Sequence, residues 1–449
     1  VADQQLRAFV ILIIMLLMTG ISSASTIEFA TGYSSDGFQG SAAAYQSVVN
    51  ARVASPSGGY GTTMLSSWSV SNQGTFGSNN NIAQRYTVKF GVKKAQAGTW
   101  GFLVGGDFGW GAAMFIDGVP LGFNAYDMYW SWNWNTPGQF FNWNYSLAPG
   151  NHVLTVYGLE NCCDGGGQGF IAPPTEWWWH LISTSDGFNQ ICMVTDTSDS
   201  AGSLGAYSGS LRNAINNSNS GYCDTIYFSI GSGLQTITPT SALPTITRPV
   251  TIDATTQPGW TSAPIIELNG ASAGGSHGFS INSGGSGSTI MGFVINRFGG
   301  HGIDLSSANN VTIQGNYIGT NSAGNADLRN WGHGISLSNA SSNTIGGTTA
   351  AARNVISRNW WKGIGIWSGS NNNVIIGNYI GVTADGTAAL GNFQSNIMLG
   401  NGSTGNRFGG PTVGERNVIS GAVYDGIEIT GGSNNTIVQG NYIGTNAAG

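Results

Sequence analysis

Residue types that carry acid-base chemistry gather in one short stretch of the C-terminal half of the chain. His301, Asp304, Asp327, Arg329 and His333 all fall within it. Histidine and carboxylate groups can transfer protons and arginine can neutralise an anion, which are the functions that hydrolysis or elimination at a sugar linkage would require. We take these five as candidates for a catalytic site, although each is also explained singly as a surface polar residue.

A pair of carboxyl groups is harder to find. Hydrolysis of a glycosidic bond needs two of them about 5 to 9.5 Å apart. The acids of this half are Asp304, Asp327, Asp385, Asp425 and Glu428. Asp425 and Glu428 lie three residues apart, and in an extended strand such side chains point to opposite faces. The lack of a suitable pair of acids therefore favours a protein without catalytic activity, and an enzyme is the alternative.

A second set of side chains is suited to binding. Trp331, Trp360, Trp361, Phe393 and Tyr424 occupy two adjacent columns when five similar segments are aligned. Flat apolar ring faces with a polar rim suit sugar rings, which present C–H faces and hydroxyl edges. The sequence thus predicts an aromatic strip that contacts carbohydrate. The alternative is that these rings pack against one another and cover the neighbouring loops.

These residues lie in a repeat array. The segment Asn-Tyr-Ile-Gly begins at Asn316, Asn378 and Asn441, so that its steps are 62 and 63 residues. Within each step a shorter Gly-Ile-x-apolar beat recurs, and its isoleucines are separated by 32, 29, 33 and 30 residues. They are Ile303, Ile335, Ile364, Ile397 and Ile427. Periods of this length are typical of solenoids, whose single repeats cannot bury their apolar face alone.

Short strands build each repeat. The apolar pieces are two to four residues long, rich in isoleucine and valine, and separated by Gly and Asn, which favours strands over helices. A parallel β-helix with isoleucine and valine columns inside follows from this pattern. Corner asparagines are expected both to adopt the left-handed backbone and to stack their amides from turn to turn. We assign this role to Asn310, Asn343, Asn373, Asn406 and Asn435.

The N-terminal part is different in composition. Residues 25–180 hold most of the tryptophans and several stretches of alternating apolar and polar residues between Gly, Pro and Asn turns. This pattern predicts an antiparallel sandwich of jelly-roll type. The stretch from Gly105 to Gly118 loosely resembles PA14-like modules. The stretch from Leu147 to Gly165 resembles exported bacterial β-domains with a Cys-Cys-x-Gly motif.

The remainder resembles a known superfamily. The segment Ser210-Leu211-Arg212-Asn213-Ala214-Ile215 is similar to the Ser-Leu-Arg-x-Ala-Ile segment that opens bacterial secreted right-handed parallel β-helix proteins of the pectin-lyase-like superfamily. The resemblance runs from Cys192 to Gly449 and departs from the pattern in the insertion Leu204 to Ser208. The resemblance implies that the β-helix winds in the right-handed sense. The superfamily contains lyases, hydrolases and noncatalytic adhesins, so the fold alone does not choose among them.

The same segment also suggests how the solenoid starts. Residues 210–217 could form a short amphipathic helix with Leu211, Ala214 and Ile215 inward. Such a helix would cap the first turn and block edge-to-edge aggregation. We therefore divide the solenoid into a capping region, residues 181–260, and the repeats, residues 261–449, with further turns expected beyond Gly449 because a solenoid needs a capped end.

Composition narrows the partners. The 449 residues carry 15 Lys and Arg against 21 Asp and Glu, a formal charge of −6, so no basic stripe can neutralise phosphates and nucleic acid is excluded as a partner. No Cys and His spacing matches a zinc site, and no motif indicates another metal or a cofactor. The sequence leaves the oligomeric state open.

The first residues predict export. An apolar run from Ala8 to Met18, followed by small residues, is typical of a secretory signal, which we place at residues 1–24. No other segment is long enough to span a bilayer, so we expect no membrane span in the mature chain. Export favours disulfides, and we expect Cys192 to pair with Cys223. The partners of Cys162 and Cys163 stay open.

The sequence therefore predicts an all-β, extracellular or cell-surface protein of two parts. An N-terminal jelly-roll-like β-sandwich is followed by a right-handed parallel β-helix that acts as a stiff scaffold for adhesion or for contact with a polysaccharide or cell-surface glycan. A polysaccharide lyase or glycoside hydrolase is the alternative. A structural fibre or sheath element is the third interpretation.

Overall fold

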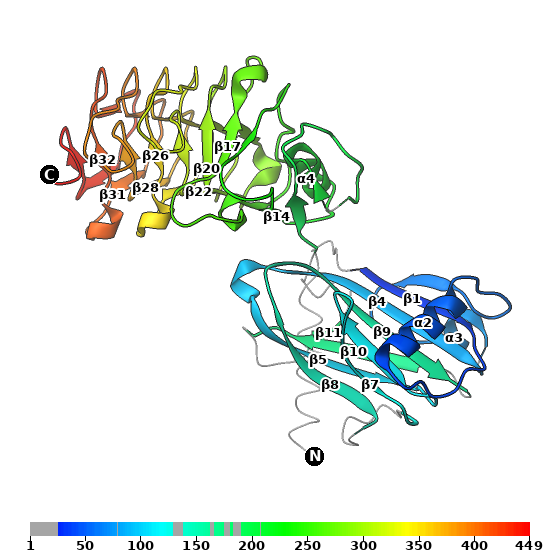
Figure 1. The fold of residues 1–449 in the computed structure, drawn as a ribbon. Helices are drawn as coiled ribbons and strands as arrows, with labels where there is room; N and C mark the ends of the chain where they lie inside the picture. The colour runs from blue at the N-terminus through cyan, green and yellow to red at the C-terminus, as the bar shows by residue number, and fades with distance from the viewer. Residues whose placement is uncertain are drawn as a thin grey trace. The chain divides into compact units, whose positions relative to one another are not determined.

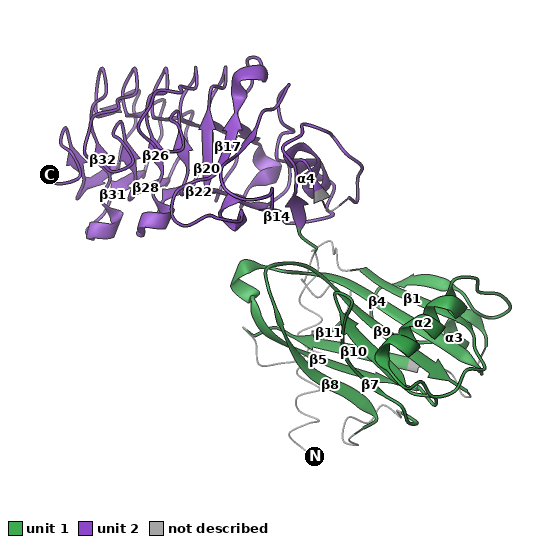
Figure 2. Ribbon diagram, viewed as in Figure 1, with its two compact units in different colours: residues 1–191 green, residues 192–449 purple. Residues whose placement is uncertain are grey.

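The chain forms two compact units, residues 1–191 and residues 192–449 (Figure 2). The structure is a computed structural model that describes residues 26–78, 80–128, 138–161, 166–174, 180–182, 190–206 and 208–449. The predicted signal at residues 1–24, Cys162 and Cys163 lie outside the described residues. In the part that is described, no helix combines the length and the apolar character needed to cross a bilayer.

The first unit is built from two antiparallel sheets (Figure 1). The larger sheet has the order β2-β1-β4-β9-β6-β7, and the smaller has the order β11-β10-β5-β8 with β3 paired to β10. The strands are β1 (Thr26–Tyr33), β2 (Thr62–Leu65), β3 (Ser69–Ser71), β4 (Ile82–Val92), β5 (Gly98–Gly106), β6 (Ala112–Ile116), β7 (Val119–Asn124), β8 (Phe140–Leu147), β9 (Gly150–Glu160), β10 (Gly166–Ala172) and β11 (His180–Leu181).

Both faces of the larger sheet are covered. On one face Tyr86 and Phe90 of β4 belong to an aromatic core with Trp100 and Phe102 of β5. On the other face lies helix α2 (Ala42–Val53), which begins at its cap Ser41 and packs its apolar side chains against the strands. A second, short helix is α3 (Asn72–Phe76), and a 3₁₀ turn is η1 (Lys94–Gln96). The predicted β-sandwich is confirmed.

The second unit consists of three all-parallel sheets. The ten-stranded sheet contains β13 (Ser208–Gly209), β12 (Cys192–Val194), β14 (Thr225–Phe228), β16 (Thr251–Asp253), β19 (Thr289–Met291), β22 (Thr312–Gln314), β25 (Thr344–Gly346), β28 (Val374–Ile376), β31 (Arg407–Gly409) and β34 (Ile437–Gln439), in that spatial order. The eight-stranded sheet contains β15 (Gln235–Ile237), β17 (Ile266–Asn269), β20 (Phe293–Asn296), β23 (Tyr317–Ile318), β26 (Val355–Ile356), β29 (Tyr379–Ile380), β32 (Val418–Ile419) and β35 (Tyr442–Ile443). The six-stranded sheet contains β18 (Phe279–Ile281), β21 (Ile303–Ser306), β24 (Ile335–Ser338), β27 (Ile364–Trp367), β30 (Ile397–Leu399) and β33 (Ile427–Ile429).

Successive turns lie in register, which is the arrangement of a right-handed parallel β-helix. The predicted isoleucine column is confirmed, because Ile303 pairs with Ile335, Ile335 with Ile364, and the same column continues to Ile397 and Ile427. The first four of these side chains are fully buried in one continuous core. Each such burial stabilises the fold by roughly 1.5–3 kcal/mol. Short 3₁₀ turns, η2 (Ala254–Thr256), η3 (Gly270–Ser272), η4 (Ser283–Gly285), η5 (Ala350–Ala352) and η6 (Val413–Glu415), occupy the corners.

The predicted asparagine column is wrong at both ends. Asn343, Asn373 and Asn406 do form a buried amide ladder, in which Oδ1 of Asn373 and Oδ1 of Asn406 each accept the backbone N–H and the side-chain amide of the asparagine one turn before. Asn310 and Asn435 stand one residue out of this column, which holds Val311 and Thr436 in those turns. They adopt the left-handed backbone, with φ of 57° and 52°, which the ladder residues do not. Amide stacking and the left-handed corner backbone, which were both expected of one column, therefore belong to adjacent positions.

The first turn is closed by the predicted helix, which is confirmed as α4 (Leu211–Asn219). Ser210 caps it by accepting the backbone N–H of Asn213 at 3.1 Å. Leu211, Ala214 and Ile215 enter the core of the solenoid. Arg212 pairs with Asp199 at 2.8 Å.

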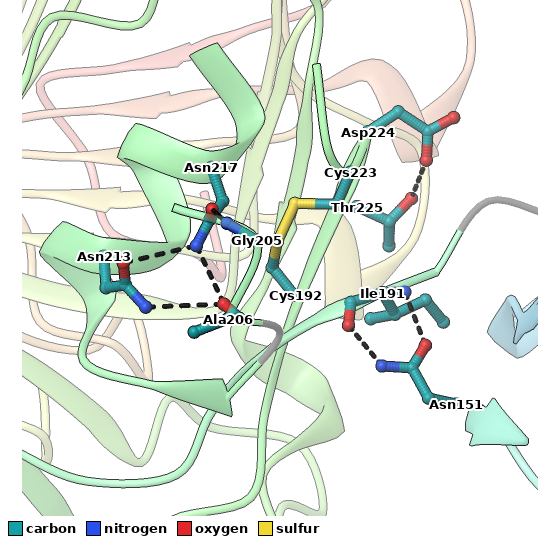
Figure 3. The surroundings of a disulfide bond; sticks show 10 residues. All are labelled: Asn151, Ile191, Cys192, Gly205, Ala206, Asn213, Asn217, Cys223, Asp224 and Thr225. Carbon is teal, nitrogen blue, oxygen red and sulfur yellow. Dashed lines mark hydrogen bonds between the residues drawn. A yellow bond between two sulfur atoms is a disulfide. The ribbon is translucent and has the colours of Figure 1, made fainter. Parts of the chain in front are cut away.

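A disulfide holds the same end of the solenoid. It joins Cys192 of β12 to Cys223, which lies just before β14 (Figure 3). These are neighbouring parallel strands, so the two residues meet on adjacent turns. The loop that the disulfide closes spans 31 residues and contains α4, and its closure restricts the unfolded chain in this region.

Candidate functional site

The outer side of the six-stranded sheet carries the candidate residues. Two positions before the first inward residue of each strand, one column runs through six consecutive turns, as the backbone hydrogen bonds between turns show. It contains His277, His301, His333, Lys362, Ser395 and Asp425. The structure thus brings together His301 and His333, two of the candidates for catalysis.

The three histidines form a stacked ladder. The ring centroids of His277 and His301 lie 4.7 Å apart, and those of His301 and His333 lie 4.8 Å apart. Nδ1 of His277 accepts the backbone N–H of His301 at 2.8 Å, and Nδ1 of His301 accepts that of His333 at 2.9 Å. A nitrogen that accepts a hydrogen bond carries no proton, so the neutral ring of His301 has its proton on Nε2.

Electrostatics favour this neutral form. The pKa of His301 is lowered to about 4, mainly by burial and also by the neighbouring His277, while Asp304 acts to raise it. The pKa of His333 is lowered to about 3, again mainly by burial and also by His301 and Lys362. Neither histidine carries a proton to donate as imidazolium near neutral pH. Their Nδ1 atoms are occupied by the backbone, so the ladder acts as structure and does not resemble a general base awaiting a substrate.

The sequence reasoning missed His277. The signal was available, because Ser276-His277-Gly278-Phe279 matches the later His-Gly-Ile segments if phenylalanine is accepted in place of isoleucine. Phe279 occupies the same inward position as Ile303 in the register of β18 and β21.

Aromatic rings form a second column beside the histidines. The ring centroids of Trp331 and Trp360 lie 5.3 Å apart, and those of Trp360 and Phe393 lie 5.1 Å apart. We call these three residues the aromatic ledge. Trp331 is 54% exposed and Trp360 is 39% exposed, even though they contact each other. The ledge therefore presents large ring surfaces to solvent from consecutive turns of a regular scaffold.

The other predicted rings lie in different surroundings. Trp361 is 44% exposed and packs edge to face on His333 at a centroid distance of 5.1 Å. Tyr424 is 71% exposed and stands beyond the last ring contact of the ledge. Trp367, which the sequence reasoning missed, contacts His333 at 4.8 Å from the outward position of β27. Its signal was the alternation of β27, in which Trp367 follows the inward residues Ile364 and Ile366 at an outward position.

Asp327 is tied into a salt-bridge cluster behind the ledge. Its carboxylate accepts hydrogen bonds from both Arg329 and Arg358. Burial opposes ionisation of Asp327, but these two guanidinium groups outweigh it and lower the pKa of the carboxyl. Arg329 also lies over the ring of Phe393, 4.2 Å from the centroid, and Arg358 lies over the same ring at 4.5 Å. The cluster supports the ledge. Two of the candidates for catalysis, Asp327 and Arg329, are engaged in its ion pairs.

Asp304 and Glu428 are too far apart to act as a pair of acids. Asp304 and Glu428 share one outward column, but three strands separate them. Four steps between neighbouring strands amount to about 19 Å. That separation is well beyond the range of about 5 to 9.5 Å that glycoside hydrolysis uses. The arrangement offers no acid pair built from these two residues.

The expectation that side chains three residues apart face opposite sides fails in this part of the chain. Oγ of Ser395, in the column of Asp425, donates to Glu428 at 2.8 Å, so the two columns share one outer face. The reason is a bend between them, at Gly426 and its equivalents, that interrupts the strand. Lys362 of the same column reaches Gln394 at 2.9 Å and lies 4.0 Å from Glu428.

The face thus offers ring surfaces, hydrogen-bond donors and acceptors, and charged groups of both signs. Within the described stretches of the chain, no group of three or more His, Cys, Asp or Glu side chains is placed to hold a metal ion. The arrangement suits reversible binding of a polar ligand with flat apolar faces.

Comparisons with known proteins gave matches among solved structures alone. No protein-family model matches the chain, and neither does any curated protein. Among solved structures, the PA14 sugar-binding domain from an RTX adhesin is 11% identical, with 36% of this chain and 97% of that chain covered and a TM-score of 0.25. The catalytic domain of a GH87 alpha-1,3-glucanase is 12% identical over 82% of this chain and 92% of its own, with a TM-score of 0.21. The A-module of the Azotobacter vinelandii mannuronan C-5 epimerase AlgE4 is 12% identical over 56% and 96%, with a TM-score of 0.25.

Proposed function

We propose that the aromatic ledge binds a glycan chain without cleaving it, in an extracellular or cell-surface protein that uses its β-helix as a stiff scaffold for adhesion or polysaccharide contact. The observation that carries the proposal is the exposure of Trp331 and Trp360, 54% and 39%, on consecutive turns. Exposed contiguous apolar surface on a folded domain usually marks an interaction site.

The ledge is preorganised for such contact. Trp360 is fixed between Trp331 and Phe393, and Arg329 lies 5.5 Å from its ring centroid. Arg329 is itself held by Asp327. A binding surface that is already ordered loses little conformational entropy when the ligand arrives. Neighbouring strands of a parallel sheet lie about 4.8 Å apart, so rings on adjacent turns can follow an extended polymer.

Catalysis is the second candidate, in the form of a lyase or glycoside hydrolase that uses the same face. Proximity of His301 to Asp304 favours it, because Asp304 acts on the pKa of His301. Two observations weigh against it: the histidine Nδ1 atoms already accept backbone N–H groups, and Asp304 and Glu428 are too far apart to act as an acid pair. The third candidate, a structural fibre or sheath element, would leave the exposed tryptophans without a ligand.

A retention assay with one double variant tests the proposal. Wild-type protein is passed over a panel of neutral and acidic insoluble glycans and compared with the Trp331→Ala, Trp360→Ala double variant. We expect at least about a tenfold loss of retention, because a few aromatic anchors that become buried on binding commonly supply most of the binding energy. Tyr424→Ala is the matched control, since this exposed ring stands outside the ledge and should change retention little.

Three outcomes would contradict the proposal. Unchanged retention with a lower melting temperature would show that the ledge is packing. Absence of wild-type retention on every glycan would remove the binding function and favour the structural element. Release of reducing ends or unsaturated products would establish an enzyme.

A further inference from the structure

We infer a second ligand site, on the outer face of the eight-stranded sheet, that takes the anionic group of an acidic sugar unit such as a carboxylate or a sulfate ester. The site is centred on Arg353 and Tyr317. It goes beyond the proposed function, because it uses a different sheet and none of the residues of the aromatic ledge.

The site is a pocket of about 170 Å³. Tyr317 of β23 and Arg353, two residues before β26, line it together with Ser262, Ala351 and Ala384. Ligand pockets for drug-sized molecules usually measure about 300–1,000 Å³. This smaller pocket suits a single charged substituent or one sugar unit.

Arg353 brings an uncompensated positive charge to the pocket. Its Nε donates to the backbone oxygen of Gly377 at 3.3 Å, and its guanidinium lies over the ring of Tyr379, 4.0 Å from the centroid. Among the described residues it has no carboxylate within ion-pair distance. Five other arginines of the solenoid do contact a carboxylate, and these are Arg212, Arg297, Arg329, Arg358 and Arg407. A half-buried cation without an acid is the kind of group that an anionic ligand would satisfy.

The repeat supplies an internal comparison. Arg416 stands 63 residues later and makes the same contacts, with Nε donating to the oxygen of Gly440 at 3.1 Å and the guanidinium over Tyr442 at 4.2 Å. Arg416 does not line the pocket. The arginine motif is therefore part of the scaffold, and the pocket is what distinguishes Arg353.

The pocket arises where the arginine pattern is interrupted. The register of β20, β23 and β26 aligns Val294, Tyr317 and Val355. Counting back two residues places Gly292 at the position equivalent to Arg353. Tyr379 and Tyr442 are each covered by an arginine of the preceding turn, whereas Tyr317 follows a turn that has glycine there. The ring of Tyr317 is left to line the pocket.

Nearby acids are already engaged. Glu267, two strands away in the same outward column, pairs with Arg297 at 3.1 Å and accepts hydrogen bonds from Thr236 and Asn296. Asp385 follows the lining residue Ala384, and its carboxylate accepts the hydroxyls of Thr383 and Thr387. Burial raises the pKa of Tyr317, so its hydroxyl stays protonated and can donate beside Arg353. A guanidinium and a hydroxyl donor together match a carboxylate or sulfate oxygen pair.

The test uses soluble probes and the whole chain. Binding of polygalacturonate, dextran sulfate and neutral dextran is measured for wild type, Arg353→Gln, Arg416→Gln and Ala351→Leu. Loss of a charge-assisted hydrogen bond should weaken binding of the acidic probe by about tenfold or more in Arg353→Gln. Ala351→Leu keeps the charge but fills the pocket, and should weaken binding similarly. Arg416→Gln is the matched control and should stay within about twofold, as for an exposed charge.

The two acidic probes identify the ligand group, since polygalacturonate supplies carboxylates and dextran sulfate supplies sulfate esters. The inference is overturned if wild type binds neither acidic probe, if Arg353→Gln and Ala351→Leu both bind them like wild type, or if Arg416→Gln loses as much as Arg353→Gln. Should Arg353→Gln fail to fold, Ala351→Leu alone decides. Failure of the aromatic ledge is a separate result, because it shows in the Trp331 and Trp360 double variant and leaves Arg353 unaffected.

Discussion

Two regions of the solenoid use the same stacking register for opposite purposes. Inside, asparagine amides of successive turns bond to one another and to backbone groups without access to water. Outside the six-stranded sheet, aromatic and imidazole rings of successive turns stack while leaving part of their surface exposed. A fixed spacing between turns thus gives stability where the column is buried, and a ligand surface where it is exposed.

The buried side of the comparison consists of three amide ladders. One contains Asn343, Asn373 and Asn406, a second contains Asn316, Asn354, Asn378, Asn417 and Asn441, and a third contains Asn330, Asn359, Asn392 and Asn396. Each amide satisfies polar groups that the corner of a turn would otherwise leave unpaired. Buried polar groups without a partner are costly, so the ladders solve a problem that every corner poses.

The largest effect should come from breaking a ladder in its middle. Asn373 is fully buried, donates to the oxygen of Ala340 and to Asn406, and accepts from Asn343. Asn373→Ala leaves these partners unsatisfied, and we expect the free energy of unfolding to fall by about 3–5 kcal/mol. Denaturant unfolding of the variant measures the loss.

The matched control is Thr436→Ala, one turn past Asn406 in the same column and only half-buried. We expect a change below about 0.5 kcal/mol there. Equal losses at the two positions would mean that the column stabilises by strand propensity and not by its buried amides.

The same comparison shows which features of the fold could be predicted from the sequence. Isoleucine columns were predictable because each beat has one Gly-Ile-x-apolar segment, which allows a single register. The amide ladder was predictable only in its middle, because at both ends the asparagine nearest to the column, Asn310 or Asn435, lies one residue before it. The ladder position itself holds Val311 and Thr436 there.

The outer face was harder to foresee for a different reason. Its contacts join side chains from different turns and from loops, such as Arg358 with Asp327, which occupy non-equivalent positions of their turns. The bend before each strand also reverses the expected facing of the preceding residue. The aromatic column could be aligned from sequence, and so could His277 if phenylalanine is accepted in place of isoleucine, whereas the support of the column by Arg329 and Asp327 needed coordinates.

An intermediate effect is expected from the pH dependence of the histidine ladder. The pKa of His333 is lowered from 6.5 to about 3 in the folded protein, so between these values the unfolded chain binds more protons. Stability from the ladder is therefore full above about pH 6.5 and falls as the pH drops toward 3, by at most about 1.4 kcal/mol per pH unit for each such histidine. Unfolding free energies at pH 7, 6 and 5 measure this slope.

His333→Asn separates this slope from that of the carboxylates. Asparagine retains an acceptor for the backbone N–H of Lys362, which His333 Nδ1 accepts at 3.2 Å, but it does not titrate. The variant should lose less stability than wild type between pH 7 and 5. Parallel pH profiles for the two proteins would show that His333 has an ordinary pKa and that the neutral ladder does not exist.

The smallest effect tests the boundary between the two roles of asparagine. Asn310 is exposed and has a φ of 57°, a conformation that glycine adopts without strain. Asn310→Gly should therefore change the free energy of unfolding by less than about 1 kcal/mol, because relief of strain offsets the greater flexibility of the unfolded chain. Asn343→Gly removes an acceptor for the N–H of Val311, at 2.8 Å, and should cost at least about 2 kcal/mol. If Asn310→Gly proves as costly as Asn343→Gly, then Asn310 belongs to the ladder after all, and the separation of corner geometry from amide stacking is lost.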